Sequence, residues 1–347
     1  MLRLNRPHPV ILSYRTYGLN LSSDSPIPGL SEELDGTRPS DLRVELREEP
    51  AWVRDARKLS SLILHSLPAA PETQDPAFVL TSFGDGQFFE LAYSDGTHFV
   101  VNGAATRIWG TAGESQTMAD LSTYFLGPVM GFILRRRGST ALHASAFSVE
   151  GHAIVLAGPA GAGKSTTAAA MAQRGLPVLC EDIAALEEKD GGFAVERGYP
   201  RVCLWPESVE MLIGSSEALP RLSPNWDKRY LALDGITAQF EKEKQPLGAV
   251  YFLAPRERAH DAPRVEEVGG QEVLLDLVQN TYMNWLLDRA QRAAEFELLA
   301  HLASRVPVRR IVPHLDPARI DALCELIVAD ARRLLANQMA AAHAAGR

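Results

Sequence analysis

The chain has 347 residues, of which 46% are hydrophobic, and a formal net charge of −8. This length and composition allow two domains with ordinary apolar cores. The negative charge argues against a nucleic-acid-binding protein, because phosphate contacts need a concentrated basic surface. The one basic cluster, Arg135-Arg136-Arg137, also fits the C-terminal end of a helix, which positive charge stabilises.

Three further features bear on the cellular compartment. Cys180, Cys203 and Cys324 are widely spaced, so we expect buried thiols in a reducing cytosol rather than disulfides or a zinc site. The N-terminus lacks the long apolar core of a secretory signal. The longest apolar run, 124–134, is about half a membrane span and contains glycine and proline. We therefore expect a soluble, cytoplasmic protein without a membrane partner.

The N-terminal part of the chain is predicted to be rich in β-structure. Short strand-like runs alternate there with glycine-containing turns, which suggests a meander. We expect a strand at 10–19, a polar loop at 22–39 and a proline-containing connector at 68–76. The three strands of the meander are expected at 78–83, 87–93 and 98–101. The segment 117–137 then favours a helix that bends near Gly127-Pro128 and ends at Gly138.

We place a domain boundary after Gly138, between a β-rich N-terminal domain, 1–138, and a catalytic domain, 139–347. The second domain is predicted to alternate strands and helices, as α/β proteins do. Its expected strands are 140–149, 152–157, 177–182, 184–188, 193–197, 201–206, 247–253 and 306–312. Its expected helices are 165–174, 206–213, most of 271–304, and a terminal helix from 316. The polar segment 214–229 is predicted to be an irregular loop or lid, and residues 340–347 to be frayed.

One stretch in the second domain carries a recognisable chemistry. Its form is G-x-x-x-x-G-K-[ST], and its residues are Gly158, Pro159, Ala160, Gly161, Ala162, Gly163, Lys164, Ser165 and Thr166. Glycines allow a loop to turn successive backbone amides toward a polyphosphate, and the following helix presents its positive end to the same anion. Lys164 would reach the β- and γ-phosphates of ATP, and Ser165 would bind Mg²⁺. The alternative is a glycine-rich turn without a ligand.

Acidic and basic side chains around this loop are candidates for further roles. Glu181-Asp182 ends the next strand, where one carboxylate can hold Mg²⁺ and a second can accept a proton from a hydroxyl. The pair can equally be an exposed or helix-capping acidic pair. His143 lies on the strand predicted to pair with the strand before the loop, and a single histidine there is often a core residue.

These residues together resemble the catalytic half of the HPr kinase/phosphorylase family. The resemblance rests on His143, the Gly158–Ser165 loop and Glu181-Asp182, in this order and at these separations. It implies a P-loop core of the phosphoenolpyruvate-carboxykinase/HPr kinase type with a mixed sheet, using ATP and Mg²⁺. It also implies Glu181 as the base, Asp182 with Ser165 at the metal, and His143 in support. Glu181 stands where that family has Asp.

A wider resemblance covers most of the chain and concerns HPr kinase-related proteins of bacterial gene clusters. It rests on the segments 14–23, 142–145, 198–206, 228–231 and 246–253. Some proteins of this kind phosphorylate a C-terminal serine of a lasso-peptide precursor. Related enzymes assemble into homo-oligomers, so a homo-oligomer is one possible state here, and the sequence leaves the oligomeric state open.

Four basic residues are candidates for binding charged groups of the transition state or the substrate. They are Arg197, at the catalytic centre, and Arg201, Lys228 and Arg229, for the substrate. Each can also be an ordinary solvated surface charge.

The residues favour an ATP-dependent kinase that transfers the γ-phosphate to a hydroxyl, foremost a serine of a peptide or protein. Two alternatives remain: a kinase for a small hydroxylated metabolite, and a nucleotide-dependent binding or scaffold module with little turnover. The sequence does not identify the acceptor, the nucleotide preference or a reverse phosphorylase activity.

Overall fold

The computed structural model describes residues 11–33, 38–68, 76–189 and 191–345. Contacts divide the chain into two compact units, one formed by residues 1–129 with 223–225 and the other by 130–222 with 226–347. The division that we propose from the sequence, 1–138 and 139–347, assigns the whole kinked helix to the N-terminal part, whereas the contacts divide that helix.

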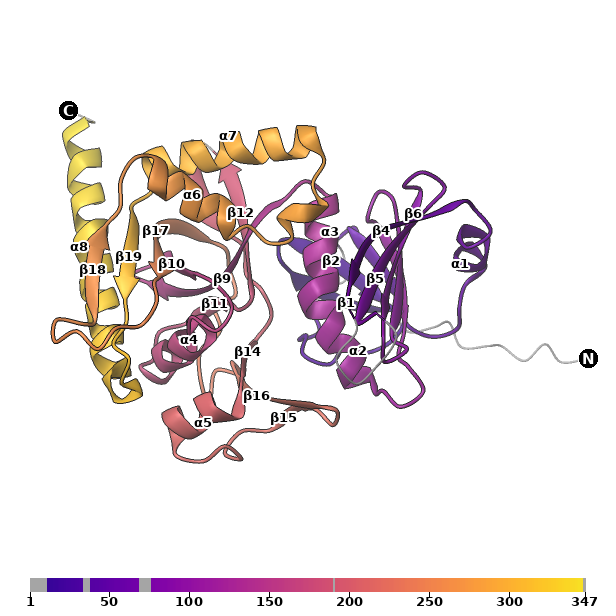
Figure 1. Ribbon diagram of the computed structural model, residues 1–347, viewed down its shortest axis with the longest axis horizontal. Helices are drawn as coiled ribbons and strands as arrows, with labels where there is room; N and C mark the ends of the chain where they lie inside the picture. The colour runs from indigo at the N-terminus through magenta and orange to yellow at the C-terminus, as the bar shows by residue number, and fades with distance from the viewer. Residues whose placement is uncertain (1–10, 34–37, 69–75, 190, 346–347) are drawn as a thin grey trace, which may run out of the picture. The chain divides into compact units, whose positions relative to one another are not determined.

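The first unit is built on one eight-stranded sheet, drawn in indigo to purple in Figure 1. Its strands are β1 (Leu12–Thr16), β2 (Leu19–Ser23), β3 (Leu42–Glu45), β4 (Ser61–Leu67), β5 (Phe78–Phe83), β6 (Phe88–Tyr93), β7 (His98–Asn102) and β8 (Arg107–Thr111). Their order in the sheet is β1-β2-β3-β8-β7-β6-β5-β4. Neighbouring strands are antiparallel except β2–β3 and β3–β8, which are parallel. The short helix α1 (Ala51–Ala56) follows β3.

The sequence predictions for this unit are partly confirmed. The meander of β5, β6 and β7 is present, with antiparallel pairing throughout. The single strand predicted at 10–19 is wrong, because Tyr17 and Gly18 form a turn with positive φ (51° and 76°) that separates β1 from β2. Residues 69–75 of the predicted connector lie outside the described residues.

A kinked helix leads from the first unit into the second, as the sequence predicts. It consists of α2 (Met118–Tyr124), the π-helical turn η1 (Phe125–Val129) and α3 (Met130–Arg136). Gly127 has non-helical dihedral angles and Pro128 lacks an amide hydrogen, which explains the kink. At the end of α3, Arg135 is buried and forms an ion pair with Glu295, so the basic cluster is partly internal.

The second unit contains a mixed sheet and a smaller three-stranded sheet. The strands of the mixed sheet are β9 (Thr140–Val149), β10 (His152–Ala157), β11 (Val178–Cys180), β12 (Ile183–Lys189), β13 (Gly192–Val195), β17 (Gln245–Leu253), β18 (Arg264–Glu267) and β19 (Val308–Val312). The main path is β10-β9-β12-β13-β17-β19-β18, β11 pairs with β9, and β10 also pairs in parallel with β17. The smaller sheet has the order β14-β16-β15, with β14 (Arg201–Leu204), β15 (Arg221–Ser223) and β16 (Trp226–Ala232).

Helices cover both faces of the mixed sheet. The helices of this unit after α3 are α4 (Lys164–Gln173), α5 (Pro206–Ile213), α6 (Gln271–Gln279), η2 (Asn284–Leu286), α7 (Arg289–Arg305), η3 (Pro317–Arg319) and α8 (Ile320–Ala345). One face packs against α6 and α7, which contribute Leu277 and Leu299, and the other against α4 and α8, which contribute Met171 and Ile327 (Figure 1). Because side chains of β10 and β17 alternate between these two cores, both strands are buried on both faces.

Most elements predicted for this unit are present, one prediction is wrong in part and one is wrong. The segment 214–229, expected to be irregular throughout, is irregular over 214–220, and its second half forms a hairpin of β15 and the start of β16. The end of the chain, expected to fray from residue 340, continues as helix α8 through Ala345. The three cysteines are free and buried, as predicted.

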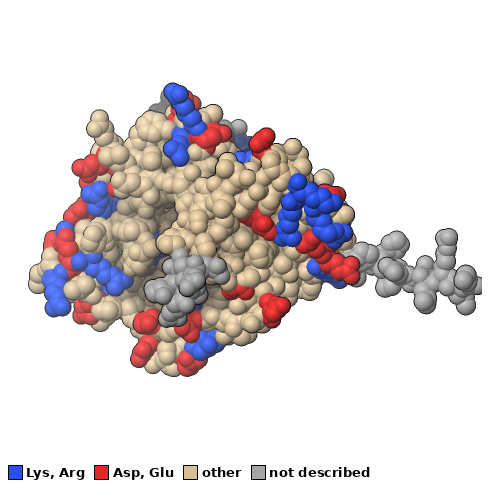
Figure 2. Space-filling view, turned by 45° about the vertical axis from the view of Figure 1, so that its right-hand side comes forward, with Lys and Arg blue, Asp and Glu red and all other residues tan. Residues whose placement is uncertain are grey.

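Two observations concern the surface. Among the described residues, no helix has the length and apolar composition needed to cross a bilayer. On the face shown in Figure 2, Lys and Arg side chains lie in small groups next to Asp and Glu side chains.

Candidate functional site

The candidate site begins at the glycine loop, residues 158–163, which joins β10 to α4. Gly158, Gly161 and Gly163 have positive φ angles of 148°, 78° and 104°. This conformation is costly for residues with a Cβ atom, and it allows successive amides to face one point. Gly163 is the N-cap of α4, so the positive end of the helix faces the same region. The strand–loop–helix context that the motif requires is therefore present.

Lys164 is the first residue of α4 and is only 6% exposed. Its ammonium group donates hydrogen bonds to the carbonyl oxygens of Gly158, at 2.7 Å, and Pro159, at 3.1 Å. Since an ammonium group has three N–H donors, one remains for a phosphate oxygen. Burial lowers the pKa of Lys164, and the negative charges of Asp182 and Glu181 oppose that shift.

A tight turn at Glu181-Asp182 positions the two carboxylates. Strand β9 pairs first with β11 and then with β12, where Ile183 lies opposite His143. Between these two strands, the Ile183 amide donates to the Glu181 carbonyl at 2.8 Å, and Asp182 has a φ of 67°. Aspartate tolerates this left-handed conformation better than most residues do. The turn directs the two consecutive side chains toward different partners.

Each carboxylate has its own hydrogen-bond partner. Ser165 Oγ donates to Glu181 Oε1 at 2.7 Å. His143 Nε2 lies 3.2 Å from Asp182 Oδ1. The structure thus brings together four residues that the sequence analysis singled out. The sequence assignment placed Ser165 with Asp182, whereas the hydrogen bonds join Ser165 to Glu181 and His143 to Asp182.

Tyr282, which the sequence analysis did not single out, also contacts this group. Its hydroxyl donates to Asp182 Oδ2 at 3.2 Å, and its ring lies edge-on to His143 with the centroids 5.9 Å apart. The Tyr282 amide donates to the carbonyl of Ala141 in β9, which fixes the backbone. A Cβ atom on Gly131 would lie 2.1 Å from the Tyr282 ring, so α3 accommodates the ring through a glycine. No local sequence signal marks Tyr282, because these contacts join distant segments.

The two carboxyl groups have opposite pKa shifts. Burial and the adjacent charge of Asp182 raise the pKa of Glu181 to about 7, against the hydrogen bond from Ser165. Burial would also raise the pKa of Asp182, but the hydrogen bond from His143 and nearby positive charge hold it below its ordinary value. Asp182 is therefore the carboxylate that stays ionised at neutral pH.

Arg197 lies in the segment that follows β13 and is 9% exposed. The neighbouring amides of Glu196 and Gly198 donate to the carbonyls of Ala185 and Leu179, at 2.9 and 2.8 Å. The segment therefore runs beside β11 and β12, the strands that carry the carboxylate turn.

Arg201 and Lys228 lie on the three-stranded sheet and contact aromatic rings. The guanidinium carbon of Arg201 lies 4.2 Å from the Tyr230 ring centroid, and Lys228 Nζ lies 5.1 Å from that of Trp205. The positive charge of Lys228 also helps to lower the pKa of Asp182. Of these two residues, Lys228 is the one whose charge acts on the carboxylate pair.

Two other predicted residues make contacts away from the carboxylates. Arg229 is buried, donates to the Ser216 carbonyl at 3.2 Å and pairs with Glu217, so it anchors the segment after α5. Thr166 Oγ1 lies 2.9 Å from Ser208 Oγ, which links α4 to α5. Lys228 and Arg229 therefore face different surroundings, as adjacent strand residues do.

The residues present fit a magnesium ion. Among the described residues, no three His, Cys, Asp or Glu side chains gather into a metal-binding group. Magnesium does not require one, since in kinases and ATPases it takes one or two protein carboxylates and completes its shell with phosphate and water oxygens. The Ser165 hydroxyl and the Glu181 carboxylate, in direct contact, are oxygen donors of this kind.

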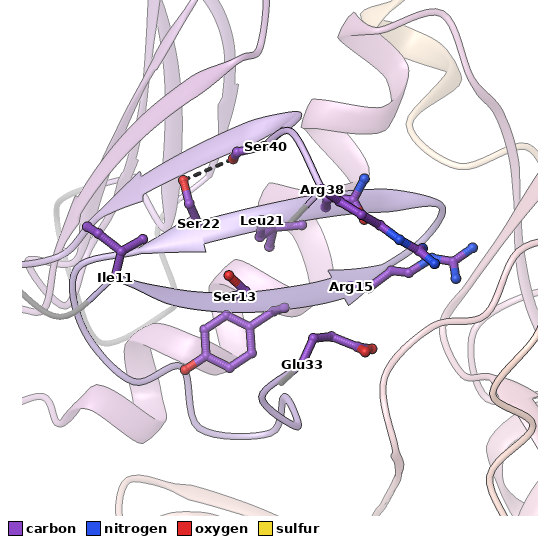
Figure 3. Close-up of a pocket in the computed structure, with 10 residues that line it drawn as sticks. Ile11, Ser13, Arg15, Leu21, Ser22, Glu33, Arg38 and Ser40 are labelled. Atoms are coloured by element: carbon purple, nitrogen blue, oxygen red, sulfur yellow. Dashed lines mark hydrogen bonds between the residues drawn. The ribbon is translucent and has the colours of Figure 1, made fainter. Parts of the chain in front are cut away.

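The first unit has a hollow of its own, shown in Figure 3. Ser13 and Arg15 from β1 and Ser22 from β2 contribute to its lining, and Ser40 Oγ donates to Ser22 Oγ at 2.9 Å. The residues that line it include one carboxylate, Glu33, and no glycine. It therefore lacks the two features, a carboxylate pair and a glycine loop, that define the candidate site.

Comparisons with known proteins add a weak structural likeness. No protein-family model matches the chain, and no curated protein matches it in sequence. Among solved structures, the Hpr(Ser) kinase/phosphatase from Coxiella burnetii is similar over 58% of this chain and 96% of its own. The identity is 12% and the TM-score 0.32. A likeness of this size carries no conclusion about activity.

Proposed function

We propose that the protein is an ATP-dependent kinase that transfers the γ-phosphate to a hydroxyl group, foremost a serine of a peptide or protein. The observation that carries this proposal is that the two adjacent carboxylates have different hydrogen-bond partners. Glu181 accepts a hydrogen bond from Ser165 of the loop helix, while Asp182 is bonded by His143 and Tyr282. A nucleotide hydrolase needs the first carboxylate more than the second, whereas transfer to a hydroxyl uses the second one as a base, so the pair favours transfer.

The phosphates would be held by the glycine loop. Its amides and the positive end of α4 bind phosphate oxygens, and the third N–H of Lys164 reaches the β- and γ-phosphates. Ser165 and Glu181 would hold Mg²⁺ on the side of Glu181 that faces α4. When bound, Mg²⁺ neutralises charge on the phosphate oxygens.

Asp182 would accept the proton of the attacking hydroxyl. Two of its oxygen lone pairs bind His143 and Tyr282, which leaves lone pairs for a substrate O–H. Its lowered pKa keeps it ionised, and its two partners fix the direction of its oxygens. This assignment exchanges the roles that the family resemblance implies for Glu181 and Asp182. Lys228 would stabilise the negative charge around the pair.

The acceptor is proposed from the sequence resemblance, because some of the similar proteins phosphorylate a C-terminal serine of a lasso-peptide precursor. Reaction of ATP labelled at the γ-phosphate with such peptides, glycerol and glucose tests the acceptor class. We expect label on serine peptides and none on the same peptides with Ser→Ala. Label on glycerol or glucose alone would contradict a peptide kinase and indicate a kinase for a small metabolite.

Two variants test whether turnover depends on the site at all. Lys164→Ala should abolish transfer, and Asp182→Asn should abolish it while nucleotide binding persists. Asn is the appropriate replacement because it also tolerates the left-handed backbone of residue 182. If cellular function survived in Asp182→Asn and Glu181→Gln but not in Lys164→Ala, a nucleotide-dependent scaffold would be the better description.

A further inference from the structure

A hollow with a volume of about 350 Å³ is formed by η2 and by the helices α6 and α7, both drawn in orange in Figure 1. It lies wholly within the second unit. Its lining residues are Val278 of α6, Asn284 and Trp285 of η2, and Arg292, Glu295 and Phe296 of α7. We call it the α6–α7 hollow. Neither the glycine loop nor the carboxylate pair lines it.

The segment after α6 joins this hollow to the carboxylate site. The His143 amide donates to the Asn280 carbonyl at 2.8 Å, and the Tyr282 hydroxyl donates to Asp182. Asn284 lies two residues after Tyr282, so the Cα atoms of these two residues are at most about 7 Å apart. A peptide whose serine lies at Asp182 would therefore reach the hollow with a residue within about five positions of that serine.

A left-handed residue turns the chain between these two places. Met283, the N-cap of η2, has a φ of 49°, which is a costly conformation for a residue with a Cβ atom. Tyr282, before the turn, bonds Asp182, and Trp285, after it, lines the hollow. One short segment thus carries both a group of the candidate site and a wall of the hollow.

Two aromatic side chains are exposed at the hollow. Trp285 is 38% exposed and Phe296 is 51% exposed, while Val278 is half-buried. Large apolar side chains around a concave site are typical of binding sites. Tryptophan is also among the residues that contribute most binding energy at interfaces. The hollow therefore fits a large apolar side chain of a ligand.

The uncompensated charge at the hollow is positive. Glu295 is 8% exposed, and the buried Arg135 balances its carboxylate. Arg292 is exposed and forms no ion pair with another described residue. Its guanidinium group can therefore bind an acidic group that lies next to the apolar side chain. The Asn284 amide supplies donors and an acceptor of the kind that binds a peptide backbone.

We infer that the α6–α7 hollow binds the acceptor peptide through a large apolar side chain and an adjacent acidic residue, within about five residues of the phosphorylated serine. This inference rests on the proposed function, namely that the acceptor is a serine of a peptide. A stable dimer interface uses about 20–30 residues of each partner, whereas six residues line this hollow. Its size and its place next to the Tyr282 segment favour one side chain of a substrate over a second copy of the chain.

Synthetic serine peptides test the inference. One set places a Phe-Asp pair one to five residues before or after the serine, and a matching set has Ala-Asn there. We expect one position at which Phe-Asp lowers the KM of the peptide by about tenfold or more. Trp285→Ala and Phe296→Ala should remove most of this preference and leave the KM of ATP unchanged. Met339→Ala, at an exposed residue of α8 on the other face of the sheet, is the matched control and should retain it.

A charge reversal tests the role of Arg292 without removing an aromatic side chain. When the preferred peptide carries Phe-Lys in place of Phe-Asp, its KM for the wild type should rise about two- to fivefold. Arg292→Glu should reverse this order, because it reverses the charge that faces the peptide. An unchanged preference for Phe-Asp in Arg292→Glu would exclude this residue from the peptide site.

Calorimetry with Ser→Ala peptides, which cannot accept phosphate, separates the inference from the proposed function. If binding favours Phe-Asp and Trp285→Ala abolishes that preference, the hollow binds peptides even where no phosphoserine forms, and the proposed function alone fails. The inference is overturned if the wild type has no preference for Phe-Asp, or if the variants, folded by circular dichroism, keep it. It is also overturned if a wild-type dimer, seen by analytical ultracentrifugation, dissociates in Trp285→Ala while the peptide preference persists.

Discussion

Ser165 Oγ and Glu181 Oε1 lie 2.7 Å apart, whereas the carboxylate of the next residue bonds His143. Two neighbouring acids thus belong to two different halves of the site. Ser165 belongs to helix α4, which follows the glycine loop, and His143 belongs to strand β9.

This division predicts different kinetic defects for Glu181→Gln and Asp182→Asn. Loss of the Glu181 charge should raise the Mg²⁺ concentration needed for half-maximal activity by about tenfold or more, as loss of a carboxylate at a metal site does. Loss of the Asp182 base should lower kcat by roughly 10²–10⁴-fold and leave the Mg²⁺ requirement unchanged. Initial rates over a range of Mg²⁺ concentrations decide the matter. The reverse pattern would restore the roles that the sequence resemblance implies.

A second prediction concerns the contact between Gly131 and Tyr282. A methyl group at residue 131 would overlap the tyrosine ring, so Gly131→Ala should destabilise the second unit by about 1–3 kcal/mol. It should also lower kcat, because the ring positions the hydroxyl that bonds Asp182. Denaturant unfolding and initial rates measure the two effects.

Tyr282→Phe is the control that separates these effects, since it removes the hydroxyl alone. Tyr282→Phe should lower kcat, and it should reduce the free energy of unfolding by less than Gly131→Ala does. In the double variant Gly131→Ala/Tyr282→Ala the methyl group no longer meets a ring, so its added cost should disappear. Additive stability losses would contradict the proposed contact.

A third prediction compares Lys228 with its neighbour Arg229. Lys228→Met should lower phosphotransfer but leave stability within about 0.5 kcal/mol, because the side chain is only partly buried. Arg229→Met should instead lower the melting temperature, because Arg229 is buried and bonds Ser216 and Glu217. The activity of the folded Arg229→Met protein should stay near that of the wild type. Equal losses of activity in the two variants would contradict the different roles that we assign to these side chains.

A fourth prediction concerns acid stability of the first unit. Burial raises the pKa of Glu90, but the hydrogen bonds and the charge of Arg57 outweigh burial and hold that pKa below its ordinary value of 4.5. Because the folded-state pKa is the lower one, the ionised carboxylate stabilises the unit above about pH 4.5. That contribution is lost as the pH falls through the folded-state pKa.

Glu90→Gln should therefore lower stability at neutral pH and flatten its decline below about pH 4.5. Hydrogen-exchange protection of strand β6, compared between variant and wild type over this pH range, is the measurement. Parallel declines in the two proteins would show that Glu90 does not carry this acid sensitivity.

Local sequence patterns predicted the parts of the fold that depend on neighbouring residues. The bend of the kinked helix follows from Gly127-Pro128, and the loop before α4 follows from its glycines and the buried strand before it. The hairpin of β15 and β16 could not be predicted in this way, because its polar sequence pairs only in the context of β14.

In the candidate site, too, local sequence patterns identify some residues and leave out those that depend on contacts between distant segments. His143, Lys164, Ser165 and the acidic pair could be identified from residue types and spacing. The partner of each carboxylate could not, because it depends on the turn in which Asp182 takes a φ of 67°. Tyr282 could not be identified either, since an isolated bridge between Leu142 and Thr281 brings it to the site.

The fate of the γ-phosphate tests the central claim most directly. The measurement compares ATP consumed, free phosphate released and phosphoserine formed, in the presence of a serine peptide and of its Ser→Ala counterpart. We predict that phosphoserine accounts for most of the ATP consumed with the serine peptide, and that Asp182→Asn abolishes its formation. Release of free phosphate at the same rate with either peptide, without phosphoserine, would contradict a kinase and indicate a hydrolase.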